Sequence, residues 1–459
     1  MPVSPARAAA FDILLRVESE SSYASELLHS SASQKLSHAD HALATELVMG
    51  VLRWRSRLDT EIAAASSQPL KKLDLEVIIA LRLALYQFRW LDRIPERAAL
   101  HESVELVKRA RKRSAAPYVN AVLRKLAAQA KSAEHAPEVP LCNPVPSVVN
   151  SFEELAEVCA HPVWLTERWT EFYGLAVALK ICEYDQSPPS TALRLRKPDA
   201  ERNLVDEGIT LHPGALLSSS RRVQSGDIRH TQAFRRHEVV IQDEASQLVA
   251  ALSGRINKDA PRILDCCAAP GGKTLAIADR NPSASVTAVE IHPHRARLMQ
   301  RLLGTDTSSQ IKTVVADART LPLANNYDAI LTDVPCSGTG TLARNPEIKW
   351  RLKPEDFAEL HERQLAILRS AVSHLAPGGR LAYSTCSLEK EENEDVVEAA
   401  LAENSALRLL DARAELARLK AEGELACPDP DSLTRGPYLR TIPGVHPCDG
   451  FFAAIVEKS

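Results

Sequence analysis

Apolar side chains recur at the spacing of amphipathic helices over the first 130 residues. Within Ala39–Leu58, leucines and valines return every three or four positions. The same spacing predicts helices over Ala6–Val17, Ala39–Leu58, Leu75–Leu91, Leu100–Arg109 and Pro117–Ala130, separated by short breaks. Five or more helices joined by short links predict a helical bundle that folds on its own.

A proline-rich stretch at 133–146 ends this pattern and has the composition of a linker. The segment that follows is mixed. Its periodicity predicts helices over His161–Tyr173 and Leu175–Tyr184, and short strands over Thr191–Leu195 and Glu238–Ile241.

Short apolar runs alternate with helical stretches from Arg262 onward. Strands are predicted over Arg262–Asp265, Val286–Glu290, Lys312–Asp317, Asp328–Asp333 and Arg380–Ser384. Helices are predicted over Lys273–Asp279, His294–Leu303, Pro354–Leu375 and Asn393–Glu403. This alternation is typical of a parallel sheet with helices on both faces. We therefore predict a multidomain chain: an all-α bundle at 1–135, a linker with a small α+β domain at 136–245, and an α/β Rossmann-like domain at 246–459.

The composition is that of an ordinary globular protein. The 459 residues are 45% hydrophobic and 25% charged, which excludes a wholly disordered or fibrous chain. The most apolar run, Leu75–Leu91, contains Arg82 and Arg89, so no membrane span is expected. Nine cysteines without a C-x-x-C pair argue against a disulfide framework and against a metal site. These features predict a cytoplasmic protein with free thiols, and the lack of a coiled-coil pattern favours a monomer.

Positive charge concentrates in the N-terminal third. Residues 1–135 carry 20 Lys and Arg against 15 Asp and Glu, a balance of +5 in a chain of net charge −3. Much of it lies in two clusters: Arg53, Arg55 and Arg57, then Lys108, Arg109, Arg111, Lys112 and Arg113. Such density suggests contact with a polyanion, although a solvated helix face is the ordinary explanation of a charge run.

Small residues and paired glycines follow the strand that ends at Asp265, in the loop CCAAPGGKT at 266–274. In an open parallel sheet, ligands bind beyond the carboxyl ends of the strands, where such a loop lets them approach the backbone. Glu290 ends the second predicted strand, 19 residues after Gly271, at an offset suited to the hydroxyls of a ribose. Asp317 ends the third and is expected to receive an adenine amino group.

Three kinds of ligand are compatible with a glycine loop of this type. Gly272-Lys273-Thr274 matches the end of a phosphate-binding P-loop, but Cys267 stands where its first glycine belongs. The dinucleotide motif G-x-G-x-x-G is absent. An adenosyl cofactor without phosphates fits better, and S-adenosylmethionine is the commonest ligand of that kind.

Two cysteines follow predicted strands at the same edge of the sheet. Cys336 comes shortly after Asp333, and Cys386 comes after the strand ending at Ser384. Most cysteines are small buried hydrophobes, but two thiols beside a methyl donor suggest covalent catalysis. Carbon 5 of a pyrimidine becomes nucleophilic once a thiolate adds to carbon 6. Asp333 is placed to hydrogen-bond or protonate ring nitrogen 3, or else to satisfy backbone donors at the strand end.

Three long blocks resemble the signatures of RNA 5-methylcytosine methyltransferases: CCAAPGGKT at 266–274, DVPCSGTG at 333–340 with NPEIKW at 345–350, and YSTCSLEKEEN at 383–393. The DGFFAA segment at 449–454 is similar to the last strand of that family. Residues 5–130 resemble the RNA-binding fold of the antitermination factor NusB. Together they are similar to the RsmB (Sun) type, which methylates a cytosine of 16S ribosomal RNA in the small subunit.

The resemblance implies roles for single residues. It makes Cys386 the nucleophile and Cys336 the thiol needed for product release. It sets S-adenosylmethionine against Glu290, Asp317, Asp333 and the loop residues Cys267, Ala268, Ala269, Pro270, Gly271, Gly272 and Lys273. Many relatives have aspartate where this chain has Glu290, and Cys266 is an extra thiol that we assign to packing. The resemblance also supports the prediction that both basic clusters contact RNA.

The sequence leaves two other functions open. One is the same chemistry on transfer RNA. The other is an RNA-binding or assembly factor with an idle methyltransferase domain, although the paired cysteines, Asp333 and the intact loop argue against it.

Overall fold

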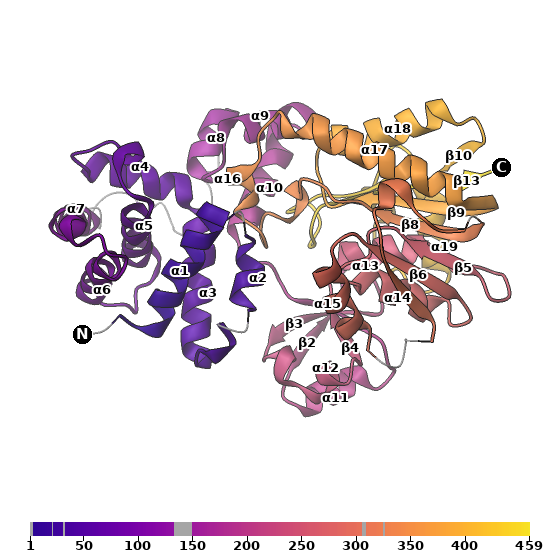
Figure 1. Ribbon diagram of the computed structural model, residues 1–459, viewed down its shortest axis with the longest axis horizontal. Coiled ribbons are helices and arrows are strands. Elements are labelled where there is room, and N and C mark those ends of the chain that lie inside the picture. The colour runs from indigo at the N-terminus through magenta and orange to yellow at the C-terminus, as the bar shows by residue number, and fades with distance from the viewer. Residues whose placement is uncertain (1–2, 21, 31–32, 133–148, 305–308, 325) are drawn as a thin grey trace. The chain divides into compact units, whose positions relative to one another are not determined.

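Apolar stripes of the kind predicted above bring the helices of the N-terminal part together. The computed structural model describes residues 3–20, 22–30, 33–132, 149–304, 309–324 and 326–459 (Figure 1). The predicted linker at 133–146 lies outside these residues. Contacts divide the chain into two compact units, Met1–Pro188 with Leu342–Arg351, and Pro189–Thr341 with Leu352–Ser459. The division into three domains at 135 and 245 stays a prediction.

The first unit is helical and is built around leucines such as Leu14, Leu47, Leu81 and Leu123. Its helices are α1 (Pro5–Glu20), α2 (Ala24–Leu28), α3 (His38–Arg53), α4 (Arg55–Ala65), α5 (Leu75–Trp90), α6 (Glu96–Arg109), α7 (Ala116–Ser132), α8 (Phe152–Val158), α9 (Val163–Tyr173), α10 (Leu175–Gln186) and α16 (Ile348–Arg351). The single helix predicted over Ala39–Leu58 is wrong in one respect. The helix ends at Arg53, and α4 begins after Trp54, whose ψ of 14° leaves the helical range.

The segment Leu342–Arg351 belongs to this helical unit although it comes late in the chain. Its side chains donate to main-chain oxygens of the helices: Trp350 Nε1 to Leu52 O at 2.6 Å and Lys349 Nζ to Arg53 O at 3.1 Å. Glu347 Oε1 accepts from the amide of Ala24 at 2.8 Å. Lys349 is 1% exposed, and burial lowers the pKa of its ammonium to about 7.

The second unit begins with a small antiparallel sheet in the order β2-β3-β1-β4. Leu193, Leu204 and Ile228 lie in its apolar core. Its elements are β1 (Ala192–Leu195), α11 (Ala200–Asp206), β2 (Thr210–Pro213), β3 (Ser220–Ser225), α12 (Gln232–Arg235) and β4 (Val239–Ile241). The sequence predicted β1 and β4, but the mostly polar strands β2 and β3 carry no apolar run by which to recognise them.

A larger mixed sheet forms the rest of this unit, in the order β11-β12-β13-β9-β8-β5-β6-β7, with β10 paired to β13. The pairs from β7 to β9 are parallel, and those on the other side of β9 are antiparallel. The strands are β5 (Arg262–Asp265), β6 (Ser285–Glu290), β7 (Ile311–Val315), β8 (Tyr327–Asp333), β9 (Leu375–Thr385), β10 (Leu407–Leu410), β11 (Thr434–Arg435), β12 (Tyr438–Thr441) and β13 (Phe451–Lys458). The expected parallel sheet is therefore extended by an antiparallel part.

Helices cover both faces of the large sheet (Figure 1). Ile263 of β5 faces a core shared with one set of helices, and the next residue, Leu264, faces a core shared with the other. The first set is α13 (Glu244–Leu252), α14 (Gly272–Arg280), α15 (Pro293–Leu303) and α19 (Ala412–Ala421), and the second is α17 (Asp356–His374) and α18 (Glu394–Glu403). No helix in the described part of the chain is long and apolar enough to cross a membrane.

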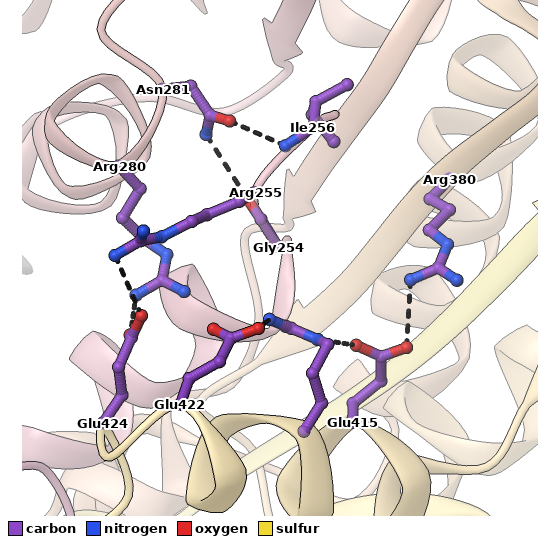
Figure 2. A network of polar contacts seen from close by, with 10 residues as sticks. Gly254, Arg255, Ile256, Arg280, Asn281, Arg380, Glu415, Glu422 and Glu424 are labelled. Atoms are coloured by element: carbon purple, nitrogen blue, oxygen red, sulfur yellow. Dashed lines mark hydrogen bonds and ion pairs between the residues drawn. The ribbon is translucent and has the colours of Figure 1, made fainter. Parts of the chain in front are cut away.

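Ion pairs hold α19 and the loop after it against the sheet domain (Figure 2). Glu424 pairs with Arg280 at the end of α14 and, at 3.2 Å, with Arg255. Glu415 of α19 accepts from Arg380 of β9 at 3.0 Å. These contacts tie helices on one face of the sheet to the strand that leads to Cys386.

Candidate active site

The carboxyl ends of β5, β6, β8 and β9 lie along one edge of the parallel part of the sheet. Strand order reverses at β5, because β6 and β7 lie on one side of it and β8 and β9 on the other. Loops that leave neighbouring strands in opposite directions open a crevice at such a point. The predicted loop, Asp333 and both cysteines all follow strands at this edge.

The glycine loop lines a cavity of about 330 Å³ at this edge. Gly271 has a φ of +108°, and a Cβ there would lie 2.8 Å from Met299 Cγ, so both conformation and space require glycine. The helix α14 starts directly after it. Of the predicted cofactor residues, the cavity is lined by Cys267, Ala268, Ala269, Pro270, Gly272, Lys273 and Asp333.

Glu290 and Asp317 lie farther along the edge, after β6 and β7. Glu290 is buried and its Oε1 accepts from the amide of His292 at 2.8 Å. Asp317 caps a short turn and pairs with Arg319 at 2.6 Å. In the described structure neither residue is part of the lining of the 330 Å³ cavity. The sequence therefore predicted the correct edge of the sheet for both carboxylates. In the structure each of them is bonded to a residue close to it in the chain.

The two predicted catalytic thiols are in contact. Parallel pairing sets Asp333 opposite Ser384, and the loops that follow bring Cys336 Sγ to 3.3 Å from Cys386 Sγ. The Gly340 amide donates to the carbonyl of Cys386 at 2.9 Å, which fixes one loop on the other. The contact with Cys386 and then burial raise the pKa of Cys336 well above its usual range. The two sulfur atoms are thus near enough to share a hydrogen bond, with either thiol as the donor.

Asp333 forms an ion pair with Lys273 beside the thiols. Lys273 Nζ donates to Asp333 Oδ2 at 2.8 Å, and Ser384 Oγ donates to Oδ1 at 2.8 Å. Burial lowers the pKa of Lys273, but the charge and hydrogen bond of Asp333 outweigh it and the net shift is upward. The ammonium also lies 4.7 Å from the centre of the Phe451 ring. Lys273 is thus a fixed positive charge at the catalytic edge.

Asp265 is a site residue that sequence reasoning missed. It ends β5, is 1% exposed, and its Oδ2 accepts from Thr274 Oγ1 at 2.6 Å, whereas its buried Oδ1 has no hydrogen-bond partner. Burial raises the pKa of its carboxyl to about 7. It also lines the cavity. The signal was present, because an acidic residue that closes the strand before a glycine loop is well placed for a ligand.

The basic clusters differ from the sequence-based expectation. Arg53 is 6% exposed and donates to Ala343 O at 3.1 Å, so its prediction as an RNA contact is wrong. In the second cluster, which lies on the surface, Lys108 pairs with Glu105, Arg109 with Asp12, and Lys112 with Asp74. With Arg111 and Arg113, these residues stay a prediction for RNA binding.

Comparison with known proteins assigns the chain to a family. A family model described as 16S rRNA methyltransferase RsmB/F matches residues 255–457, and the NusB family model matches residues 4–128. The probable ribosomal RNA small subunit methyltransferase B of Bacillus subtilis (strain 168) is 34% identical over 469 residues, which cover 100% of both chains. The chain belongs to the family of ribosomal RNA small subunit methyltransferase B.

Family members extend over nearly the whole chain. Ribosomal RNA small subunit methyltransferase B of Klebsiella pneumoniae is 32% identical over 442 residues, covering 93% of this chain and 92% of its own. The crystal structure of PH0851 has the same fold, with a TM-score of 0.80 at 22% identity and 100% coverage of both chains. The prediction of an rRNA methyltransferase with a NusB-like helical domain is confirmed, and RNA is its substrate.

Proposed function

We propose that this enzyme methylates carbon 5 of a cytosine in small-subunit ribosomal RNA, with S-adenosylmethionine as methyl donor and Cys386 as covalent nucleophile. The observation that carries the proposal is the pair of thiols 3.3 Å apart, beside the Asp333–Lys273 ion pair, on neighbouring strand ends. A methyl transfer to nitrogen or oxygen needs no thiol, whereas carbon 5 of cytosine must first be activated by addition at carbon 6.

The residues at the cavity fit the cofactor. S-adenosylmethionine carries an ammonium group, and Asp265 offers a buried carboxylate oxygen without a partner. Residues 267–270 and Gly272 line the cavity beside it, and Gly271, in its left-handed conformation, turns the chain between them. When bound there, the cofactor supplies an electrophilic methyl group. Glu290 and Asp317 are the neighbouring carboxylates that the adenosyl part would meet after they exchange their local partners.

The thiols divide the covalent chemistry between them. The thiolate of Cys386 forms a bond to carbon 6, and the displaced electron pair moves to carbon 5, which then accepts the methyl group. A base takes the proton from carbon 5, a role that we assign to the sulfur of Cys336. The electron pair left behind restores the ring double bond and breaks the bond between sulfur and carbon 6, which frees Cys386 as a thiolate. Cys336 lies next to Cys386 throughout and assists this release.

Asp333 and Lys273 balance charge on the ring. An ionised carboxylate only accepts hydrogen bonds, and both Asp333 oxygens do so here. The pair nevertheless holds a proton, on Lys273, which can shift through the carboxylate as negative charge builds at ring nitrogen 3. The cytosine must leave its stack to reach these groups, at a cost of a few kcal/mol unless a loop already exposes it.

The test uses Cys336→Ala purified from cells and run on a denaturing gel with and without ribonuclease. We expect a slowly migrating, ribonuclease-sensitive band that disappears when Cys386→Ala is added. Cys386→Ala alone should lose methyl transfer to small-subunit rRNA while its affinity for S-adenosylmethionine stays within about twofold. Cys427→Ala, which removes a thiol outside the site, is the matched control and should show neither effect.

Three results would contradict the proposal in whole or in part. Turnover at the normal rate in Cys386→Ala would exclude this residue as the nucleophile. Sequencing of the trapped RNA would identify the target. If it is a transfer RNA, the substrate is transfer RNA and not ribosomal RNA, with the same chemistry. If the wild-type enzyme forms no 5-methylcytosine in any RNA, the covalent mechanism falls altogether.

A further inference from the structure

A single buried carboxylate connects the two loops that carry the thiols. Glu392 Oε1 accepts from the Ser337 amide and from Gln364 Nε2, each at 2.8 Å. Its Oε2 accepts from Ser337 Oγ and Ser387 Oγ, each at 2.5 Å. Ser337 directly follows Cys336, and Ser387 directly follows Cys386. Each catalytic cysteine therefore has a neighbour bonded to the same side chain.

The surroundings hold Glu392 rigidly in place. Its side chain is 0% exposed, and its carbonyl accepts from Tyr383 Oη at 2.6 Å. The next residue, Asn393, donates to the carbonyl of Ser387 at 2.9 Å and accepts from Thr385 Oγ1 at 2.5 Å. The loop of Cys386 is thus fixed on both sides by consecutive residues of one short turn.

Glu392 is a buried acid that neutral groups alone satisfy, as Glu244 is by the amides of the loop at 215–217. No ion pair among the described residues includes Glu392, and all four of its donors are amide or hydroxyl groups. Glu392 also lies near enough to Cys336 to be among the groups that raise the pKa of this thiol, after the contact with Cys386 and burial.

We propose that Glu392 is a positioning residue that holds the two thiol loops at the spacing at which Cys336 assists release of the Cys386 adduct. The proposal rests on the covalent mechanism proposed above. Glu392 is not among the residues that line the cavity proposed for the cofactor. Its hydrogen bonds to Ser337 and Ser387 act on the cysteines through one peptide bond each. Loss of the carboxylate should leave Cys386 able to add to the base but Cys336 badly placed for the second half of the reaction.

The first test measures the spacing without RNA. Phenylarsine oxide condenses with two neighbouring thiols, forming two arsenic–sulfur bonds and releasing water, so its capture reports how readily Cys336 and Cys386 meet. We expect the wild-type enzyme to bind one equivalent, Cys336→Ala to bind none at this site, and Glu392→Ala to bind at least tenfold more slowly. Ser337→Ala removes only one of the two hydrogen bonds to Oε2, so its capture rate should lie between those of the wild type and Glu392→Ala.

The second test follows the reaction. Glu392→Ala should accumulate the ribonuclease-sensitive adduct seen in Cys336→Ala, with steady-state turnover at least tenfold lower and KM for RNA within about twofold. A merely structural role would lower adduct and turnover together. Normal turnover, or a folded Glu392→Ala that forms no adduct while Cys336→Ala does, would overturn the positioning role. If Glu392→Ala does not fold, Ser337→Ala decides by the same two readouts.

These readouts separate the two proposals. Absence of any adduct in Cys336→Ala would refute the covalent mechanism, whereas arsenical capture would still report on Glu392. Unchanged capture in both Glu392→Ala and Ser337→Ala would refute the positioning role even if the adduct forms as expected.

Discussion

The carboxyl of Asp265 should make cofactor binding depend on pH. Burial raises its pKa to about 7 in the protein alone, and the partnerless Oδ1 is the atom proposed to meet the cofactor ammonium. Only the ionised carboxylate attracts this ammonium, so binding is linked to loss of the proton. Affinity should therefore fall as the pH drops below 7.

The size of the effect follows from the pKa. With a pKa of about 7, roughly half of Asp265 is ionised at pH 7 and about 3% at pH 5.5, so affinity should fall about fifteenfold. This window is the informative one. The α-amino group of the cofactor, with a pKa of about 8, stays mostly protonated throughout it. Above pH 8 the α-ammonium group of the cofactor would instead lose its proton and its charge.

Isothermal titration of the RNA-free enzyme with S-adenosylmethionine at pH 7 and pH 5.5 measures both affinities. Asp265→Asn should bind about tenfold more weakly at pH 7, since it loses a charge-assisted hydrogen bond, and its affinity should not change with pH. Asp328→Asn, at the start of β8, is the control and should keep the wild-type dependence. A wild-type change below twofold, or the same slope in Asp265→Asn, would refute the assignment.

Two further predictions concern the helical unit. Burial lowers the pKa of Lys349 to about 7, so between this value and its ordinary pKa the unfolded chain binds more protons and stability rises with pH. Lys349→Met removes this titrating group. Its free energy of unfolding should exceed that of the wild type at pH 7, and this difference should decrease by about 2 kcal/mol between pH 7 and pH 9 in urea titrations. A constant difference would contradict the low pKa. Separately, replacing Lys108, Arg109, Arg111, Lys112 and Arg113 by glutamine should weaken rRNA binding and flatten its dependence on salt in filter-binding assays. An unchanged salt slope would make the cluster a solvated helix face.

The sequence predicted best where one physical signal dominates. Arg262–Asp265 is found as predicted because its apolar run is too short for a helix and is followed by a glycine-containing loop, which together favour a buried strand. The sequence also predicted that Cys336 and Cys386 follow strands at the same edge, whereas the pairing of β8 with β9 and the contact of the two thiols come from the structure. In contrast, β2 and β3 are largely exposed, and the antiparallel strands β11 and β12 are short, so neither pair has a periodic signal.

Partners distant in the sequence were the main obstacle. Arg53 looked like an RNA contact because its neighbours Arg55 and Arg57 are basic, but its acceptor, Ala343, lies 290 positions later. Glu392 was present in the quoted block 383–393, yet its importance comes from Ser337 and Gln364 in other elements. A one-dimensional pattern records charge and periodicity, but not which buried groups satisfy one another.

The helical unit is not continuous along the chain, since Leu342–Arg351 completes it after most of the other unit's sheet strands. During synthesis the first 188 residues leave the ribosome long before Lys349 and Trp350 exist, so the unit must wait with the main-chain oxygens of Leu52 and Arg53 lacking these donors. A protein cut between residues 188 and 189 would keep this gap permanently. The two units therefore cannot be exchanged between proteins as separate modules unless the ten-residue segment is moved as well.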